Sequence, residues 1–389
     1  MRFGILSSVC NSHSGARAPI ELGISLAKRG HSVALFVIDK DKDDTTFQYL
    51  IQHGIEIIFL PYPTFPFGNI RVIFRIARLI KEKRLEILTS HTIPTYHLGG
   101  VLSGRPIIMT YHGSQFDAIY ERILPYETPS LKLHFFNFLA NVYIYVRMAL
   151  MIWTSKKIVS ISTYTQKELL RLYFRMSSII HWSATPHYFQ DLLPSSTFYK
   201  KQKGEVLLLS ISRITPYKGF HTIIDTFQRI APKNATLLIV GSLPVQPYLA
   251  FLRKRMGKKV KIFLDPSDTE LVSLYQTCDL YVTCDRYLFF GMPVLEAAAF
   301  GIPAIAMDYA AAREMVRDKK TGYIVRSEKE LAEKMFELIK HAKKRKAFGE
   351  HAKVFAQTRF GWFPMIQKYE RLFRKYAKNS PATTKERQE

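Results

Sequence analysis

Short runs of consecutive apolar residues alternate along the chain with longer stretches in which apolar residues recur every three or four positions. The runs are typical of strands buried on both faces of a parallel sheet, and the longer stretches are typical of amphipathic helices that cover such a sheet. Residues 2–9, 16–29 and 33–38, for example, predict a strand, a helix and a second strand. The pattern therefore predicts an α/β chain of the doubly wound type.

The same alternation continues through most of the sequence. Further strands are predicted at 55–60, 85–89, 107–110, 157–161, 178–182, 205–212, 236–240, 260–264, 280–282, 302–307 and 323–325, and helices at 70–84, 132–153, 164–173, 248–255, 269–276 and in three places within 328–378. The length of 389 residues is too great for one ordinary core, and a segment rich in Pro, Ser and Lys interrupts the pattern midway. We therefore expect an N-terminal domain at 1–185, a linker at 186–204, a second domain at 205–358, a helix at 359–378 that crosses back to the first domain, and a disordered tail at 379–389.

Charge is the strongest signal in the composition. Lys and Arg number 56 against 32 Asp and Glu, and the net charge of +24 predicts affinity for polyanions such as anionic lipid, nucleic acid or phosphorylated substrates. No basic run interleaves with aromatic residues as in known nucleic-acid modules, so we expect no nucleic-acid partner. Cys10, Cys278 and Cys284 match neither a disulfide framework nor a zinc site. We accordingly expect reduced cysteines, no bound metal and a cytoplasmic location.

Three stretches bear on membranes. The first residues of the chain lack the apolar core and cleavage site of a secretory signal. Leu131–Trp153 is the most hydrophobic span, but Lys132, Arg147 and other polar residues interrupt it, so we do not expect it to cross a membrane. It forms either core or a helix that presents aromatic side chains at a membrane interface. Arginines at helical spacing within 70–84 indicate either a solvated face or contact with anionic lipid.

The segment Cys284–Met307 concentrates the candidate chemistry. A buried strand at 280–282 leads into it, and Gly291 and Pro293 open a helix. In open parallel sheets, such helix N-termini lie at the carboxyl ends of the strands, where phosphorylated ligands bind. Glu296, one turn into the helix, can accept two hydrogen bonds from a vicinal diol such as that of a ribose. The alternative is that it only complements the helix dipole.

Other candidate residues also follow predicted strands. Arg213 and Lys218 flank the loop after the strand 205–212, where they can hold a diphosphate and stabilise its charge as it leaves. The alternative is an ordinary pair of solvated loop cations. His91 and His112 each follow a strand of the first half and therefore also lie on the ligand side of the sheet.

Several blocks of the second half resemble the donor-binding half of glycosyltransferase family 4. These blocks are ISRITPYKGF, LLIVGSLP, KIFLDPSDTELVSLYQTCDLYVTC, FGMPVLEAAAFGIPAIAMD and AREMVRDKKTGYIV, which occur in the family's order and spacing over residues 207–325. The first half resembles the family more loosely, through SHSGARAPIELGISLAKRGHSV, LTSH, TYHGS and KIVSISTYTQKELLRL. FGWFPMIQKYERLF resembles the family's terminal Trp-bearing helix. The resemblance thus extends over nearly the whole chain.

The resemblance implies an α/β GT-B fold, in which two Rossmann-like doubly wound domains face each other across a cleft. It also implies transfer of a sugar from a nucleotide-diphosphate donor with retention of anomeric configuration and without a metal or other cofactor. The residues implied in catalysis are His112, Arg213, Lys218 and Glu296. Those implied in donor binding are Gly15, Ser212, Leu264, Asp265, Phe290, Gly291, Met292, Pro293 and Leu295.

The resemblance also assigns roles by position. Arg213 and Lys218 would grip the diphosphate, and Glu296 the ribose hydroxyls. The loop Phe290–Pro293 would meet the sugar and phosphate through backbone amides, while Leu264 and Asp265 would lie beside the base. Gly15 would admit the diphosphate from the first domain, and His112 would contact the sugar near the reacting carbon.

One departure from the family pattern matters for function. The family has two glutamates with seven residues between them, and the first position holds Leu288 here, eight before Glu296. We expect a retaining transferase that uses a UDP- or GDP-sugar and a lipid-linked or polysaccharide acceptor at the cytoplasmic membrane face, on an anionic membrane surface. The alternative is a non-catalytic subunit that binds nucleotide-sugar or glycan, for which Leu288→Glu would not lower stability. An epimerase or phosphorylase of the same fold is a third possibility.

Overall fold

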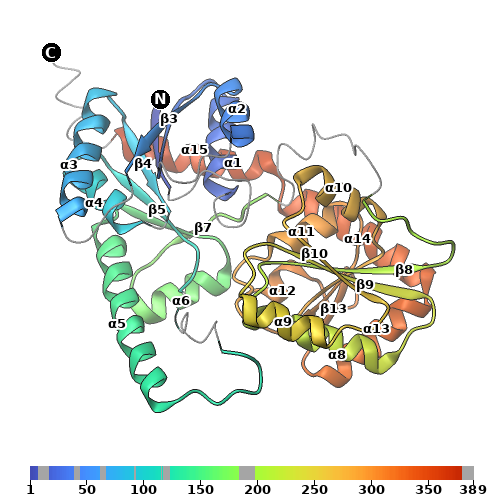
Figure 1. Ribbon diagram of the computed structural model, residues 1–389. Coiled ribbons are helices and arrows are strands. Elements are labelled where there is room, and N and C mark those ends of the chain that lie inside the picture. The colour runs from blue at the N-terminus through green and yellow to red at the C-terminus, as the bar shows by residue number, and fades with distance from the viewer. Residues whose placement is uncertain are drawn as a thin grey trace. The chain divides into compact units, whose positions relative to one another are not determined.

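The computed structural model describes residues 1–7, 17–38, 44–61, 67–91, 93–114, 116, 123–183 and 198–378 (Figure 1). The chain divides into two compact units. Unit 1 comprises Met1–Ser114, Val142–His181 and Trp362–Glu389, and unit 2 comprises Gln115–Asn141 and Trp182–Gly361. The expected tail at 379–389 and most of the expected linker at 186–204 lie outside the described residues.

Unit 1 is built on a parallel sheet, with strand order β3-β2-β1-β4-β5-β6-β7 in the part of the chain described. Its strands are β1 (Arg2–Leu6), β2 (Ser32–Ile38), β3 (Ile55–Leu60), β4 (Ile87–Ser90), β5 (Ile107–Tyr111), β6 (Lys157–Ser160) and β7 (Ser178–Ile179). Its helices are α1 (Arg17–Ala27), α2 (Asp44–Gln52), α3 (Phe67–Glu82), α4 (Pro94–Leu102), α6 (Thr163–Tyr173) and α15 (Trp362–Lys378). The helix α5 (Leu131–Thr154) begins in unit 2 and ends in unit 1.

Unit 2 repeats this architecture, with strand order β10-β9-β8-β11-β12-β13. Its strands are β8 (Val206–Ile211), β9 (Ala235–Gly241), β10 (Val260–Leu264), β11 (Leu280–Thr283), β12 (Ala304–Met307) and β13 (Gly322–Val325). Its helices are the short η3 (Pro216–Lys218), α8 (Phe220–Ile230), α9 (Gln246–Lys254), α10 (Asp268–Thr277), α11 (Met292–Ala299), α12 (Ala312–Met315), α13 (Glu328–Lys340) and α14 (Ala342–Arg359). The expectation of two Rossmann-like doubly wound domains is therefore confirmed.

Local sequence explains where these elements form. The strand β9 is buried at every position, as expected of a strand covered on both faces. The apolar residues Ile20, Leu22, Ile24 and Leu26 of α1 are all buried, as expected of an apolar helix packed within its domain. Ser267 starts α10 with a capping box. Its hydroxyl accepts from the backbone N–H of Glu270, and the Glu270 carboxylate accepts from the backbone N–H of Ser267.

The C-terminal helix α15 packs within unit 1. The ring of Phe373 is fully buried, and its centroid lies 5.0 Å from that of Phe3 in β1. The Glu370 carboxylate accepts a hydrogen bond of 2.7 Å from Nε of Arg29, just beyond α1. Apolar burial and an ion pair thus both fasten the last described helix to the first elements of the chain.

The helix α5 contains the hydrophobic span Leu131–Trp153. The helix is continuous over 24 residues, and an 18-residue window in it has a mean hydropathy of 1.5 with only 17% of that window buried. By length and composition alone, this helix is therefore long and apolar enough to cross a membrane. Length and composition do not decide whether a helix crosses a membrane, so the expectation that Leu131–Trp153 does not cross one stays a prediction.

Candidate active site

The strand order of unit 2 reverses between β8 and β11, which are neighbours in the sheet. Leu208 pairs with Leu280 and Leu209 with Tyr281, so the carboxyl ends of both strands lie at one edge of the sheet. The chain leaves β8 toward β9 on one side and leaves β11 toward β12 on the other. Ligands of open α/β sheets bind at this kind of reversal, because the two departing loops leave a crevice.

The loop after β8 carries the two expected diphosphate cations around one aromatic ring. The Arg213 guanidinium lies 5.8 Å from the ring centroid of Tyr217 and donates a hydrogen bond to its hydroxyl. The Lys218 ammonium lies 4.8 Å from the same centroid. Cation–π contacts with this ring hold the two charged side chains close together. The sequence predicted the two cations but not the ring that positions them.

Lys218 is also joined to the loop after β11. Its Nζ lies 2.5 Å from Oδ2 of Asp285, and both side chains are mostly buried. The second carboxylate oxygen, Oδ1, accepts from the backbone N–H of Tyr287 at 2.9 Å, so Asp285 itself is held in place. Gly219, at a φ of 70°, permits the approach of the two loops, because a Cβ there would lie 2.6 Å from Cβ of Cys284. Sequence reasoning did not identify Asp285, although its place directly after a strand at the reversal was a usable signal.

Glu296 lies in the second turn of α11, the helix that follows β11. Its side chain is only 3% exposed, and its Oε2 accepts a hydrogen bond of 2.7 Å from the Tyr275 hydroxyl of α10. A carboxylate that only complemented the helix dipole would lie at the solvated surface. The burial of Glu296 therefore favours a specific binding or structural role over the dipole alternative.

The turn before α11 places the other expected residues of this loop. Gly291 is the helix N-cap with a φ of 74°, and Met292 and Pro293 form the first turn. Phe290 is buried, with its ring edge-on to Phe360 at 5.9 Å. Leu295 is fully buried and its N–H donates to the carbonyl of Gly291 at 3.2 Å, so neither its side chain nor its N–H faces a ligand.

The end of β9 brings the remaining expected residues of unit 2 together. Gly241 accepts from the backbone N–H of Asp265 at 2.9 Å, and a Cβ at Gly241 would lie 1.9 Å from the carbonyl oxygen of Ser212. Asp265 has a positive φ of 49°, and Leu264 packs against the core of unit 2. Ser212 and Asp265 thus follow β8 and β10, the two strands that flank β9, and approach Gly241 from either side.

Leu288 is a buried core residue at the start of the loop. Its side chain is 4% exposed, and its Cδ1 occupies the space where a Cβ of Gly291 would lie, at 2.9 Å. Its carbonyl accepts from the N–H of Ala311 at 3.0 Å. The position that carries a carboxylate in the family is therefore filled here by an apolar side chain with little access to water.

The candidate residue of unit 1, His112, pairs with His91. Nδ1 of His91 and Nε2 of His112 lie 3.1 Å apart, so one ring donates to the other. Burial lowers the pKa of His112 to about 4, and burial followed by the proximity of His112 lowers the pKa of His91. Both rings are therefore neutral at pH 7, and His112 acts as a hydrogen-bonding group rather than a cation. Gly15, the other expected residue of this unit, lies outside the described residues.

A glutamate that sequence reasoning missed holds the loop that contains His112. Glu168 of α6 accepts from the hydroxyl of Tyr111 at 2.7 Å and from both the N–H and the hydroxyl of Ser114, at 3.0 and 2.6 Å. These bonds anchor the residues on either side of His112. The sequence offered no signal for Glu168, because it lies 54 residues from Ser114 along the chain.

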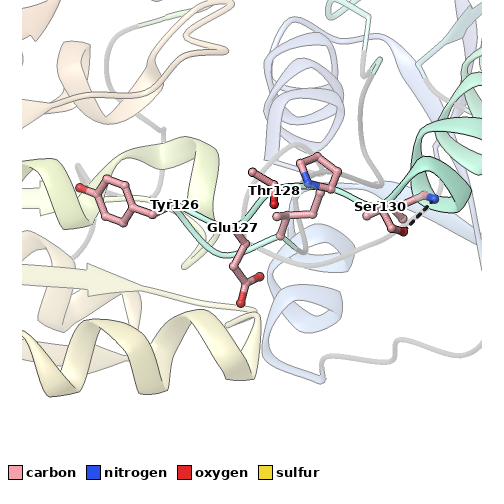
Figure 2. Close-up of a pocket in the computed structure, with 7 residues that line it drawn as sticks. Tyr126, Glu127, Thr128 and Ser130 are labelled. Carbon is pink, nitrogen blue, oxygen red and sulfur yellow. Dashed lines mark hydrogen bonds between the residues drawn. The ribbon is translucent and has the colours of Figure 1, made fainter.

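A hollow of about 730 Å³ lies in the segment that precedes α5. Its lining comes from Ile123, Tyr126, Glu127, Thr128, Pro129, Ser130 and Leu133. Figure 2 shows these side chains following one another along one extended stretch, with the Ser130 hydroxyl accepting from the N–H of Leu133. None of the expected donor-binding residues lines this hollow, so it does not bear on the donor site.

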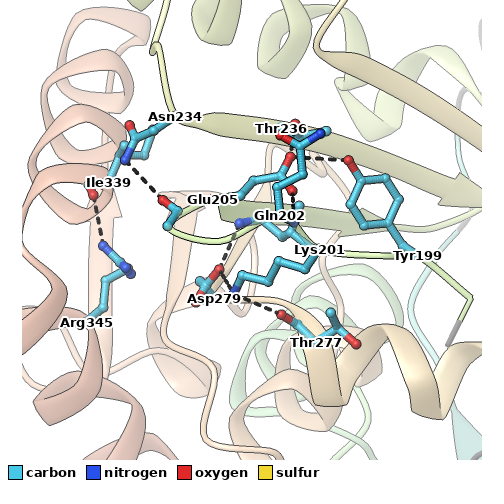
Figure 3. Close-up of polar contacts among 12 residues, drawn as sticks. Tyr199, Lys201, Gln202, Glu205, Asn234, Thr236, Thr277, Asp279, Ile339 and Arg345 are labelled. Carbon is cyan, nitrogen blue, oxygen red and sulfur yellow. Dashed lines mark hydrogen bonds and ion pairs between the residues drawn. The ribbon is translucent and has the colours of Figure 1, made fainter.

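A polar network at the opposite edge of the unit 2 sheet is structural. Asp279 accepts from Nζ of Lys201 at 2.6 Å and from the N–H of Leu207 at 2.8 Å, while Glu205 accepts from Thr236 at 2.5 Å (Figure 3). These residues lie just before β8 and β11 or at the second positions of β8 and β9, at the amino ends of the strands. The network anchors the end of the expected linker away from the ligand edge.

The described residues contain no group of three or more His, Cys, Asp or Glu side chains placed to hold a metal ion. The chemistry available at the reversal is that of two cations and two carboxylates: Arg213 and Lys218 with Asp285 and Glu296. Such a set suits a ligand that combines a diphosphate with a diol.

Two family models match the chain. The model described as Glycosyltransferase Family 4 matches residues 16–181, and that described as Glycosyl transferases group 1 matches residues 195–355. N-acetyl-alpha-D-glucosaminyl L-malate synthase of Bacillus anthracis is 21% identical over 365 residues, which are 91% of this chain and 91% of that protein. The GDP-mannose-dependent alpha-(1-6)-phosphatidylinositol monomannoside mannosyltransferase of Mycobacterium tuberculosis is 28% identical over 177 residues, covering 41% of this chain and 45% of that one.

Solved structures share the fold. Anabaena HepE in complex with UDP and glucose has a TM-score of 0.75 at 18% identity, covering 96% of this chain and 100% of its own. A glycosyltransferase from Rickettsia africae has a TM-score of 0.72 at 20% identity, with 97% and 99% coverage. Both comparisons show that the fold is GT-B. Because the two family models match successive parts of the chain and the structure has the corresponding fold, this protein belongs to glycosyltransferase family 4.

Proposed function

We propose that this glycosyltransferase moves a sugar from a UDP- or GDP-sugar to a lipid-linked or polysaccharide acceptor at the cytoplasmic face of the membrane, with retention of anomeric configuration and without a metal. The observation that carries the donor half of this proposal is that Arg213 and Lys218 follow β8 while Glu296 lies in the helix after β11, the two neighbouring strands at which the order of the unit 2 sheet reverses. The cations match a diphosphate, and the buried carboxylate matches the two hydroxyls of a ribose.

Each residue of this group has a defined part in the proposed reaction. The bond between the anomeric carbon and the diphosphate oxygen breaks, and the nucleoside diphosphate leaves with the electron pair. Arg213 and Lys218 stabilise the charge that develops on it. An ammonium has three donor hydrogens, so Lys218 can keep its bond to Asp285 and still donate to a phosphate oxygen. The acceptor oxygen bonds to the anomeric carbon on the same face, and its proton passes to the departing phosphate.

For His112 of unit 1 we propose the role that the resemblance implies, a contact with the donor sugar. Its low pKa, caused by burial, keeps the imidazole neutral, so it can bind a sugar hydroxyl as an uncharged hydrogen-bonding group. Glu168 holds the residues beside it through Tyr111 and Ser114, which limits the movement of the loop. His112 therefore serves the proposal as a positioning contact for the donor sugar.

Relatives support the kind of donor and acceptor. HepE is named in complex with UDP and glucose, and the mycobacterial relative is named as a GDP-mannose-dependent enzyme acting on a phosphatidylinositol monomannoside. A further relative of Staphylococcus aureus is named as a capsular polysaccharide biosynthesis glycosyltransferase. We extend these classes, a nucleotide-sugar donor and a lipid or polysaccharide acceptor, to this protein, together with an anionic membrane surface as partner.

A panel of UDP- and GDP-sugars tests the donor half. We expect one nucleotide to raise the unfolding temperature of the wild type and much less that of Arg213→Ala, and the corresponding sugar to be hydrolysed or transferred with release of nucleoside diphosphate. Lys233→Ala, on the solvated turn before β9, is the matched control for the loss of one positive charge. If no nucleotide binds, or if Arg213→Ala binds as tightly as Lys233→Ala does, the donor assignment is wrong.

The second candidate is a non-catalytic subunit that binds nucleotide-sugar or glycan, and the observation that favours it is the buried Leu288 in place of a carboxylate. In this case nucleotide would stabilise the fold in the same panel, but no donor would be turned over with any acceptor. Release of nucleoside diphosphate from a bound donor therefore separates the two candidates.

A further inference from the structure

The helix α5 exposes a broad apolar surface. Six of its large apolar side chains are each more than half exposed, namely Leu131, Phe135, Phe138, Tyr143, Val146 and Trp153. Exposed apolar area of this extent is unusual for a protein surface in water, and it marks a contact with another apolar phase.

The exposed side chains occupy one half of the helix. With 3.6 residues per turn, successive side chains are about 100° apart, which places the exposed apolar residues within a sector about 180° wide, bounded by Phe136 and Tyr145. The polar residues His134, Asn137 and Asn141 fall in the opposite half. The exposed apolar side chains therefore form one side of the helix, and the other side carries these polar residues together with the buried Met151 and Ile152.

The end of α5 is fixed within unit 1. Met151 and Ile152 are fully buried in a core cluster with β5 and α6, and the ring of Tyr145 stacks on that of Tyr173 at 5.0 Å. A helix packed in this way would have to leave its core to span a bilayer, and His134, Asn137 and Asn141 would then face lipid. The division of α5 fits a helix that lies in the plane of the interface, with one half immersed.

Two features favour lipid over a second copy of the chain. The seam between two packed helices is a narrow stripe, whereas the apolar sector of α5 covers about half of its circumference. Cationic side chains also accompany the sector. Lys132 lies within it, Arg147 lies at its edge, and the Arg175 guanidinium lies 5.1 Å from the ring of Trp153. These cations complement anionic headgroups, and long Lys and Arg side chains reach the headgroups while their stems stay in the apolar layer.

We propose that α5 is the element that docks this protein on an anionic lipid bilayer. The helix lies parallel to the membrane, and the side that carries its exposed apolar residues, from Leu131 to Trp153, is immersed. Docking rests on apolar insertion, and the net charge of +24 adds attraction from a distance. This inference deepens the membrane part of the proposed function by naming its surface, and it does not require that sugar transfer occur.

Co-flotation with vesicles tests the proposal on the full-length protein without donor. Vesicles of phosphatidylcholine mixed with phosphatidylglycerol are compared with vesicles of phosphatidylcholine alone, at low and high salt. We expect binding to the mixed vesicles that persists in substantial part at high salt, because salt screens charges but not inserted apolar surface. Loss of all binding at high salt, or no binding under any condition, overturns the proposal.

A matched pair of variants locates the surface. Phe138 of α5 and Phe363 of α15 are 63% and 62% exposed, so glutamate at either position creates the same charge at the same exposure. Phe138→Glu should weaken vesicle binding by about tenfold or more, while Phe363→Glu should leave it unchanged. Equal effects would overturn the assignment to α5. Thermal unfolding of both variants confirms that they are folded.

Trp153 offers a direct readout of insertion. It is 57% exposed on the apolar side of α5, so its emission should shift to the blue with mixed vesicles and be quenched by lipids brominated in their acyl chains. Trp153→Phe should remove this change. Sedimentation of the protein alone addresses the other occupant: a dimer that Phe138→Glu converts to a monomer, without vesicle binding by the wild type, would assign the surface to a second copy and refute the lipid proposal.

Discussion

Glu296→Gln is the sharpest test of the donor site, because it replaces one carboxylate oxygen by an amide nitrogen and leaves the shape of the buried side chain almost unchanged. The carboxylate is 3% exposed and held by the Tyr275 hydroxyl at 2.7 Å, so a glutamine at this position stays in the same place. The variant loses the negative charge and with it the strength of two charge-assisted hydrogen bonds to a ribose. The ribose contact should therefore weaken, while contacts to the diphosphate remain.

The expected magnitude follows from the number of bonds. A hydrogen bond to a charged group contributes about 1–1.5 kcal/mol more than a neutral one, so two such bonds lose about 2–3 kcal/mol, or about 30- to 150-fold in Kd. Titration calorimetry with the preferred nucleoside diphosphate measures this loss. The same nucleotide without its ribose hydroxyls should bind the wild type weakly. Its affinity for Glu296→Gln should be nearly equal to its affinity for the wild type.

Tyr275→Phe is the control for this experiment. It keeps the carboxylate and removes the 2.7 Å hydrogen bond, so the free energy of unfolding should fall by about 1 kcal/mol with the preference for ribose retained. The reasoning is refuted if Glu296→Gln still prefers the ribose nucleotide to its dideoxy analogue. It is also refuted if Tyr275→Phe loses that preference to the same extent, since Glu296 would then have a structural role only.

Three further predictions concern charge, burial and pH. Lys218→Met should weaken binding of the nucleoside diphosphate by about 1.5–3 kcal/mol in calorimetry and leave the nucleoside unaffected, and an equal loss for both would contradict the diphosphate role. Leu288→Glu buries a carboxyl group in an apolar space, so urea unfolding should show a loss of about 2–4 kcal/mol; an unchanged midpoint would instead fit the alternative of a non-catalytic subunit, for which no stability loss is expected. Burial lowers the pKa of His112 and of His221 from the ordinary value of 6.5 to about 4. For His221, the nearby charges of Arg286 and Arg255 lower the pKa further. The folded state therefore binds fewer protons than the unfolded state between these values, and the free energy of unfolding should fall by about 1 kcal/mol per histidine from about pH 7 to about pH 5.5; a flat urea midpoint over this range would contradict the low pKa values.

The local pattern of the sequence was sufficient to predict each strand of both sheets and most of the helices, but not the helices α2, α4 and α12. Continuous apolar runs such as 33–38 and 236–240 are required of strands covered on both faces, and the structure has β2 and β9 there. The positions of Arg213, Lys218 and Glu296 after strands or within the next helix turn also followed from the sequence. In a parallel sheet, whatever follows a strand lies at its carboxyl edge.

The tertiary structure alone decided which of these residues meet. Lys218 and Asp285 are 67 residues apart in the chain, and His91 and His112 are 21 apart, so their pairings depend on which strands become neighbours in the sheet. The burial of Leu288 and the exposure of the apolar half of α5 are likewise invisible in composition, because a leucine or phenylalanine has the same hydrophobicity in a core and on a surface. Sequence periodicity describes one element at a time. Partners and exposure are properties of the packed chain, set by which faces of distant elements cover one another.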